Sequence, residues 1–383
     1  MADYQVIIIG AGPAGSMAGY FLAKSGFRVL ILEKSSFPRR KVCAGGLTHR
    51  AYQQIPFNIN PVLHSKVNWG YVTSRGRLIT TIRRDLPISY LVDRPSFDAF
   101  LLDQALQVGA ECHLGSRVTA IHLAQESIRV DANLQNYTCD YLIGADGVNS
   151  LVAKTTGLIP DRKTSLAYEA RLSLPANPNE KWIDSISFDF GTLLGGYGWI
   201  FPKKDHLNVG VCKSWPNQRA TKRHLQRFIN QHPVLKRLPI IDLRAFPVPL
   251  GGEIYKLNHN HVLLAGDAAN LADPWLGEGL YYALKSARYA SDAIISRCQG
   301  RTNDLSLYTQ KINETFIPQF MYARRMSILV NSIPYLNMRV LKSSPTLQNM
   351  IVDLLLGQRE YRDIWQELKT RFPQLVINII KKQ

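Results

Sequence analysis

The stretch YQVIIIGAGPAGSMAGYFLAKSGFRVLILEKS, from Tyr4 to Ser35, has the pattern of a complete strand–helix–strand unit. Its first apolar run, 6–9, is β-branched and continuous, as expected for a strand buried on both faces. Gly10, Gly12 and Gly15 follow with the spacing GxGxxG, at the turn into the predicted helix. The first glycine permits a tight turn, the second admits a pyrophosphate, and the third lets the helix pack closely. The stretch therefore predicts a nucleotide-binding α/β fold.

The second predicted strand, RVLILE, ends at Glu33. An acidic residue at this distance from the glycine turn accepts hydrogen bonds from ribose hydroxyls, and it disfavours a 2′-phosphate. The phosphates of the nucleotide would lie at the start of the helix, where free N–H groups and the helix dipole attract negative charge. The unit therefore predicts FAD or NAD, rather than NADP, as the bound nucleotide.

Two later strand-to-helix junctions favour a flavin. CDYLIGADGVNSLVAK carries Asp146 after an apolar run, and HNHVLLAGDAANLADPWLGEGLYYALKSARYASDAI carries Asp267 and a helix start at Gly277 and Gly279. Ligands of open α/β sheets gather at such junctions. We expect Asp267 to bind ribityl or phosphate-side hydroxyls, and the helix start to place its positive dipole at the O2 edge of a flavin.

The order of these motifs resembles the glutathione reductase-like FAD fold of the p-hydroxybenzoate hydroxylase type. Within that fold, the chain resembles the geranylgeranyl reductase family. Four stretches carry the resemblance, namely KVCAGGL (41–47), YLVDRPSFDAFLLDQA (90–105), GYGWIFPK (196–203) and GDAANLADPWLGEGLYYAL (266–284). The resemblance implies an FAD-dependent reductase that saturates isolated C=C bonds of a geranylgeranyl-type isoprenoid by hydride transfer from reduced flavin. The isoprenoid would be a diphosphate, a chlorophyll ester or a prenyl lipid.

The resemblance also implies which residues surround the cofactor. At the adenosine end these are Ala14, Glu33 and Val118. Around the ribityl chain and the ring these are Cys43, Ala44, Gly46, Arg94, Asp267, Gly279 and Leu280. The Cys43 thiol has two interpretations, because it could tune the ring or transfer a proton, or it could be a small apolar residue in a glycine loop.

The stretch GYGWIFPKK places Tyr197, Trp199 and Phe201 on one face of a predicted strand, because residues two apart share a face. In isolation this is an ordinary half-buried strand. Next to a flavin, it becomes the predicted wall of a channel for a prenyl chain. Lys203 and Lys204 would then lie near the mouth of the channel, close to a phosphate or a lipid head group.

We expect an α/β fold in which a Rossmann-like FAD-binding domain is interleaved with a mixed β-sheet substrate domain. The expected FAD-binding parts are 1–64, 85–165 and 249–300. The substrate domain would comprise 65–84 and 166–248. Residues 301–383 read as helical and amphipathic, broken by Pro334 and Pro345. This last region would cap the core, contact a membrane surface, or do both.

The formal net charge of +17 favours anionic partners. Nine Lys or Arg residues lie between Lys203 and Arg237 against one acid, and five lie between Lys34 and Arg50 against none. No second GxGxxG occurs, so electrons would arrive by transient docking of NADPH or from an acidic ferredoxin. Lipid head groups also suit such a surface. Nucleic acid is not expected, because no nucleic-acid-binding motif accompanies the charge.

The five cysteines are scattered without metal-ligand spacing, which favours reduced thiols and predicts no metal site. Reduced thiols in turn favour a cytoplasmic location, either free or at the surface of a membrane. The same flavin motifs also serve monooxygenases, halogenases and non-redox carotenoid cyclases acting on hydrophobic metabolites. The halogenase alternative is less favoured, because halogenases carry a WxWxIP-like run. In this chain the first Trp of that run is Tyr197 and the Ile is Phe201. A third alternative is a flavin- or lipid-carrying protein without turnover.

Overall fold

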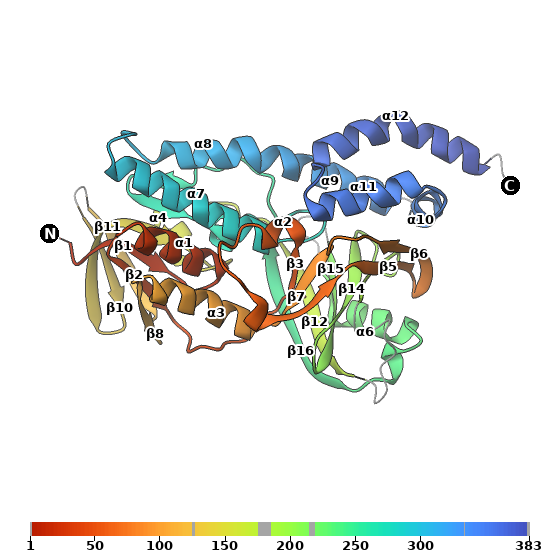
Figure 1. Ribbon diagram of the computed structural model, residues 1–383, viewed down its shortest axis with the longest axis horizontal. Coiled ribbons are helices and arrows are strands. Elements are labelled where there is room, and N and C mark those ends of the chain that lie inside the picture. Colours follow the sequence, from red (N-terminus) through yellow and green to blue (C-terminus); the bar gives the residue numbers. More distant parts are fainter. Residues whose placement is uncertain (1, 125–126, 175–184, 214–218, 333, 381–383) are drawn as a thin grey trace.

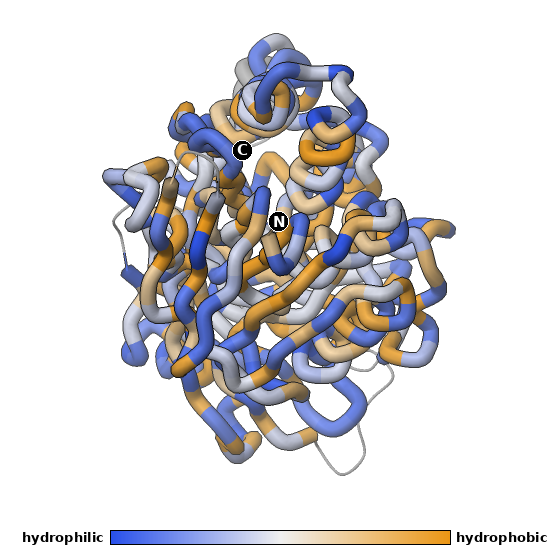
Figure 2. Tube along the Cα trace, turned by 90° about the vertical axis from the view of Figure 1, so that its left-hand side faces the viewer, coloured by the Kyte–Doolittle hydropathy of each residue, from blue (hydrophilic) through white to orange (hydrophobic). Residues whose placement is uncertain are grey.

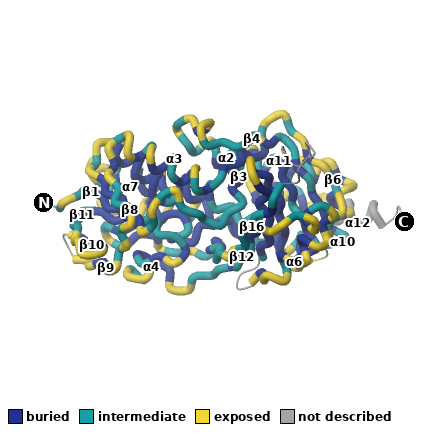
Figure 3. The backbone as a smooth tube through the Cα atoms, turned by 90° about the horizontal axis from the view of Figure 1, so that it is seen from below, coloured by how far each residue is buried: buried dark blue, intermediate teal, exposed yellow. Residues whose placement is uncertain are grey.

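The computed structural model describes residues 2–124, 127–174, 185–213, 219–332 and 334–380, although not the side chains of 334–335 and 372–380. Figure 1 shows three parts: an α/β part that holds the N-terminus, a second β-sheet part, and a row of helices that crosses both. Buried residues run through both sheet-containing parts, and exposed residues concentrate at their rims and loops (Figure 3).

The first sheet has eight strands and carries the glycine turn near its centre. Its main order is β17-β18-β11-β1-β2-β8, and β1 (Tyr4–Ile9) pairs in parallel with both β2 (Val29–Glu33) and β11 (Gln135–Gly144). The remaining strands are β8 (Glu111–Leu114), β9 (Val118–Leu123), β10 (Ile128–Ala132), β17 (Asn258–His259) and β18 (Val262–Leu264). The apolar residues of β1 from Val6 onward are buried, which explains their continuous hydrophobic run.

Three long helices pack beside this sheet. Helix α1 (Pro13–Lys24) follows the glycine turn and contacts both α3 (Arg94–Gln107) and α7 (Leu280–Cys298). The short helix α4 (Leu151–Thr156) follows β11. The starts of α1, α3, α4 and α7 border a common space, since Gly12, Arg94, Leu151 and Leu280 line the same cavity.

The second sheet has seven strands in the order β16-β12-β15-β14-β13-β5-β6. Most pairs are antiparallel, but β13 and β5 run in parallel. Its strands are β5 (Trp69–Ser74), β6 (Arg77–Arg83), β12 (Thr164–Ser173), β13 (Ser185–Phe190), β14 (Gly196–Pro202), β15 (His206–Lys213) and β16 (Ile240–Pro249). Helix α6 (Lys222–Gln231) packs on one face, where Phe228 contacts Gly198.

A small third sheet links the two parts. Its strands are β3 (Gly46–Thr48), β7 (Ser89–Val92) and β4 (Leu63–Val67), with β7 in the centre. Strand β3 leads into the short helix α2 (His49–Tyr52). The loop before β3 therefore lies where the first and second sheets meet.

The C-terminal region is helical, as expected. It comprises α8 (Ser306–Thr315), α9 (Ile317–Ser332), α10 (Pro334–Ser343), α11 (Pro345–Leu356) and α12 (Tyr361–Ile380). Helices α10 and α11 begin at the two prolines, which fit the first turn of a helix but not its interior. Apolar segments run through the centre of the molecule beneath these helices (Figure 2). Within the described residues, the model contains no helix that is both long and apolar enough to span a membrane.

The predicted fold class is confirmed: a Rossmann-like sheet, a mixed sheet and C-terminal helices form one interleaved molecule. We propose that the two large sheets mark the two interleaved domains. The expected membrane contact rests partly on the C-terminal stretch 371–383, an apolar run followed by two lysines. The structure does not describe the side chains of most of this stretch.

Candidate functional site

A cavity of about 550 Å³ lies between the first and second sheets. It is bordered by the glycine turn, by the loop before β3, by the start of α7, and by β14. It brings together most of the residues proposed from the sequence, namely Gly10, Gly12, Ala14, Glu33, Cys43, Ala44, Gly46, Arg94, Val118, Asp146, Tyr197, Trp199, Asp267, Gly277, Gly279 and Leu280. These residues come from segments up to 270 positions apart in the chain.

The three glycines of the turn have different surroundings. Gly10 has φ +99°, a conformation that glycine adopts without strain. A Cβ at Gly15 would overlap the carbonyl oxygen of Gly10, so this glycine serves the packing of α1 and does not line the cavity. A Cβ at Gly12 would meet only the Arg39 guanidinium, at 3.5 Å. The space beside Gly12 is therefore open on the cavity side.

The adenosine end of the cavity is built around Glu33. This buried carboxylate accepts hydrogen bonds from the N–H groups of Ala11 (2.9 Å) and Ser35 (2.9 Å). The Arg39 guanidinium lies 4.0 Å from it and also pairs with buried Asp98 at 3.3 Å. Because a carboxylate has about four acceptor positions, Glu33 keeps capacity for the hydroxyls of a ribose.

Asp146 holds the start of α4, because its Oδ2 accepts from the N–H groups of Leu151 (2.6 Å) and Val152 (3.3 Å). Its Oδ1 is buried without a hydrogen-bond partner among the described residues. Burial raises the pKa of this carboxyl. An orphaned polar atom of this kind in a cavity wall is what a bound polar ligand would satisfy.

Asp267 and Lys41 face each other across the cavity wall. Lys41 Nζ lies 3.7 Å from the Asp267 carboxylate and 2.9 Å from the centroid of the Phe246 ring. Burial lowers the pKa of Lys41 to about 8, although Asp267 opposes the shift. Neither Lys41 nor Phe246 was expected as a site residue. The position of Lys41 two residues before Cys43 was a signal for it, whereas nothing in the local sequence pointed to Phe246.

The helix start at Gly279 is tied through Glu278 to the junction of β3 and α2. Its carboxylate accepts from the Thr48 hydroxyl and from the Arg50 guanidinium, whose Nε lies 3.0 Å away. Helix α7 begins at Leu280, and its N-cap residue Gly279 has no side-chain cap. The first N–H groups of α7 are thus available to a ligand in the cavity.

These features fit FAD. An open glycine turn lies at the start of a buried helix, Glu33 lies where a ribose would be bound, and an uncapped helix start lies at the far end. Arg94 at the start of α3 lines the same cavity, but both its Nε and its Nη2 are committed to Asp98, at 2.7 and 2.8 Å.

The aromatic stretch forms the cavity wall opposite the glycine turn. Tyr197, Trp199 and Phe201 line the cavity, whereas Ile200 belongs to a different apolar cluster on the α6 side of the sheet. The Tyr197 hydroxyl donates to the carbonyl of Leu276, and burial raises the pKa of this hydroxyl well above its usual value.

One prediction about this stretch is wrong. Lys203 does not lie near a mouth: it is buried, and its Nζ donates to the carbonyls of Gly45 (3.0 Å) and Val92 (2.9 Å). The lysine reaches inward because β14 ends against the loop before β3. There its ammonium is a second donor to the Gly45 carbonyl, which also accepts from the Val92 N–H at 2.9 Å. Lys204 is exposed, as expected.

A second, apolar cavity of about 100 Å³ adjoins the first. The two share the lining residues Ile88, Ile186, Phe188, Leu276 and Leu355. We call this second cavity the apolar extension. The rest of its wall comes mostly from aliphatic and aromatic side chains of β5, β6, β13, helices α9 to α12 and the loop before α7, together with Asn337.

Comparisons with known proteins agree with this geometry. Residues 3–174 match the family model described as FAD binding domain. An uncharacterized protein of Methanosarcina barkeri is 34% identical over 77% of this chain and 76% of its own length. The digeranylgeranylglycerophospholipid reductase of Methanococcus vannielii is 27% identical over 99% of this chain and 95% of its own length.

The fold has a solved counterpart. A geranylgeranyl bacteriochlorophyll reductase-like protein from Thermoplasma acidophilum superposes with a TM-score of 0.79 and 22% identity, covering 96% of this chain and 98% of that one. The match to the FAD-binding family model shows that FAD is the cofactor of this protein. The chain belongs to the geranylgeranyl reductase family of FAD-dependent oxidoreductases.

Proposed function

We propose that the protein reduces isolated C=C bonds of a geranylgeranyl-type chain carried by a diphosphate or a chlorophyll ester. The observation that carries the proposal is that the two cavities adjoin and share five lining residues. The polar cofactor end passes the aromatic wall of Tyr197, Trp199 and Phe201 and leads into the apolar extension. A long, branched hydrocarbon attached to a polar head group has the same sequence of polar and apolar surfaces.

The apolar extension supplies binding without hydrogen bonds. Burial of apolar surface contributes about 25 cal/mol per Å², so a multi-isoprenoid chain gains affinity with each unit that enters. Its walls exclude water from the reacting alkene. In this proposal the chain passes Trp199 and extends toward Ile186 and Met350.

The residues of the cofactor end orient the reaction. When bound and reduced, FAD supplies two electrons to the alkene as hydride. A proton must then reach the neighbouring carbon. The Cys43 thiol lines the cavity, and its Sγ accepts a weak hydrogen bond from the Gly45 N–H at 3.4 Å. We assign the delivery of this proton to the Cys43 S–H, with solvent restoring the proton to the sulfur.

Electron supply is a further part of the proposal. NADPH or an acidic ferredoxin would reduce the cofactor by transient docking on the basic surface. An excess of positive charge raises the association rate of either donor, and this rate would fall with added salt.

The experiment is an anaerobic incubation of the dithionite-reduced holoenzyme with geranylgeranyl diphosphate, followed by mass analysis of the product. The proposal expects pairs of hydrogen atoms to be added without oxygen. Geranyl diphosphate is the matched short substrate and should react less well, because it cannot fill the apolar extension. An unchanged mass for every isoprenoid would overturn the proposal, and a product that forms only in air would favour a monooxygenase.

A further inference from the structure

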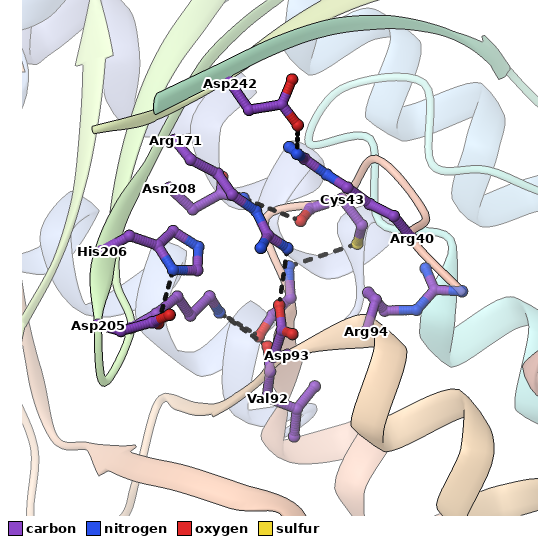
Figure 4. A network of polar contacts seen from close by, with 12 residues as sticks. Arg40, Cys43, Val92, Asp93, Arg94, Arg171, Asp205, His206, Asn208 and Asp242 are labelled. Carbon is purple, nitrogen blue, oxygen red and sulfur yellow. Dashed lines mark hydrogen bonds and ion pairs between the residues drawn. The ribbon is translucent and has the colours of Figure 1, made fainter. Parts of the chain in front are cut away.

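Three buried polar side chains of the second sheet hold the loop that carries Cys43. The Glu169 carboxylate of β12 accepts from the Cys43 N–H at 2.7 Å. The Asn208 amide of β15 donates to the Cys43 carbonyl at 3.2 Å, and Lys203 donates to the Gly45 carbonyl at 3.0 Å. Figure 4 shows the contact between Asn208 and the Cys43 carbonyl. We call Glu169, Lys203 and Asn208 the Cys43 clamp.

The clamp leaves the loop little room to move. Both peptide groups of Cys43 have a partner on the second sheet. Gly45 has φ +66°, and a Cβ there would overlap the Val92 carbonyl. Glu169 is itself held by Arg40, whose Nη2 donates to its other oxygen at 3.0 Å. Buried hydrogen bonds to charged groups contribute more than neutral ones, so the clamp fixes the backbone firmly.

Asn208 also connects the loop to the aromatic wall. Its Oδ1 accepts from the Trp199 indole N–H at 2.7 Å, so one buried amide bridges the indole and the Cys43 carbonyl. The indole lies on Gly210, where any Cβ would overlap the ring. Trp199 thus has a single position, fixed by a polar contact on one side and by Gly210 beneath it.

The members of the clamp do not belong to the binding surface itself. Glu169, Lys203 and Asn208 are absent from the cavity lining formed by the described residues, whereas Cys43 and Trp199 are part of it. The clamp can therefore act on substrate or cofactor only through the residues that it holds. This arrangement distinguishes it from a set of direct ligand contacts.

We infer that Asn208 is the positioning residue that sets the Cys43 loop in register with the Trp199 wall, supported by Glu169 and Lys203. The inference rests on the proposed function, in which the loop and the wall face the two reaction partners. Because the two come from different sheets, their separation depends on such a bridge. Small misplacements of reacting groups lower rates steeply, so the bridge affects turnover more than binding.

The test substitutes Asn208→Asp in the FAD-loaded protein. The new side chain keeps an acceptor for the Trp199 indole but loses the donor to the Cys43 carbonyl. Freed from this contact, the loop opens more often, and we expect iodoacetamide to alkylate Cys43 about fivefold faster, as read by peptide mass analysis. With geranylgeranyl diphosphate, kcat should fall about tenfold while KM stays within about twofold.

Asn331→Asp is the matched control. Asn331 is also buried and also donates to a carbonyl, that of Ser327 at 2.8 Å, but it lies in α9 away from the loop. It should leave the alkylation rate and kcat at wild-type values. If Asn208→Asp matches the control in both measurements, the inference is wrong.

If Asn208→Asp does not bind FAD, a second variant still tests the inference. Trp199→Phe removes only the indole N–H end of the bridge, and it should raise the Cys43 alkylation rate less than Asn208→Asp but in the same direction. An unchanged alkylation rate in Trp199→Phe would then reject the bridge. If the wild type reduces no isoprenoid and the alkylation rates still respond, the proposed function fails and the positioning role stands.

Discussion

The cofactor end of the cavity and its apolar extension are built by different means. At the cofactor end, the chain presents backbone N–H groups, glycines without side chains, and a few charged groups such as Glu33, Lys41 and Asp267. In the apolar extension, the wall consists of side chains from three strands, four helices and the loops beside them, which are distant in sequence. The first recognises a ligand by polar geometry, and the second accepts one by shape and hydrophobicity alone. Damage to the first should remove the cofactor, whereas damage to the wall beside the second should spare it.

The largest expected effect comes from Gly12→Ala. The backbone at Gly12 has φ −73°, which alanine adopts readily, and a Cβ there would not clash with the protein. It would, however, occupy the approach of the pyrophosphate. Overpacking of about 1–3 kcal/mol predicts FAD binding that is roughly 5- to 150-fold weaker, measured by titration of the apoprotein with flavin fluorescence as the signal.

Gly15→Ala is the contrasting variant. Its Cβ would overlap the Gly10 carbonyl within the protein, so both stability and FAD binding should fall. If Gly12→Ala bound FAD as tightly as the wild type, the pyrophosphate would not lie at the glycine turn.

The difference between the two ends also explains what could be predicted from the sequence. The glycine turn, Glu33 and the junctions at Asp146 and Asp267 are local patterns, because backbone recognition of phosphates needs a fixed spacing within one strand–turn–helix unit. The apolar extension has no such pattern, since Ile186 and Met350 become neighbours only through the tertiary fold.

The partners of the clamp residues also could not be predicted from the sequence. Glu169 and Asn208 are polar residues within apolar strands, which marks them as buried and paired but does not name the partner. Lys203 was misplaced for a related reason. Two adjacent lysines after a proline suggested the charged mouth of a channel, and only the fold shows that one of them is buried and donates to two backbone carbonyls.

Trp199→Ala should give the next largest effect, and it tests the wall between the two ends. Removing a buried indole costs about 3–5 kcal/mol of stability and leaves a void beside Gly210. We expect KM for geranylgeranyl diphosphate to rise at least about tenfold, because the wall loses its largest apolar surface. FAD content, read from the flavin absorbance, should stay at wild-type levels.

Trp69→Ala is the matched control for Trp199→Ala. Trp69 lies in β5 of the same sheet, is only half-buried, and does not line either cavity among the described residues. It should lose some stability without a change in KM. Loss of flavin in Trp199→Ala would mean that Trp199 is an ordinary core residue and does not form a substrate wall.

The last expected effect concerns Lys203, and its size depends on pH. Burial lowers the pKa of Lys203 to about 8, from 10.5 for an exposed lysine. Below about pH 8 the lysine is charged in both the folded and the unfolded chain, so the full cost of burying the charge is present. Between pH 8 and 10.5 the unfolded chain binds more protons than the folded one. The wild type should therefore gain stability relative to Lys203→Met, by about 1.4 kcal/mol per pH unit, as measured by urea unfolding.

Near neutral pH the same substitution has two opposing consequences. Lys203→Met removes the cost of the buried charge, but it also removes this donor from the carbonyls of Gly45 and Val92. Each lost hydrogen bond from a charged group costs about 1.5–3 kcal/mol, although the Gly45 carbonyl keeps its bond from the Val92 N–H. The net change in unfolding free energy near neutral pH is therefore small. The test is how the difference in unfolding free energy between the wild type and Lys203→Met changes with pH. Lys204→Met, which removes the exposed neighbouring lysine, should change the unfolding free energy by no more than about 0.5 kcal/mol. A difference between wild type and Lys203→Met that stays constant from pH 8 to 10 would mean that Lys203 is solvated and does not hold the Cys43 loop.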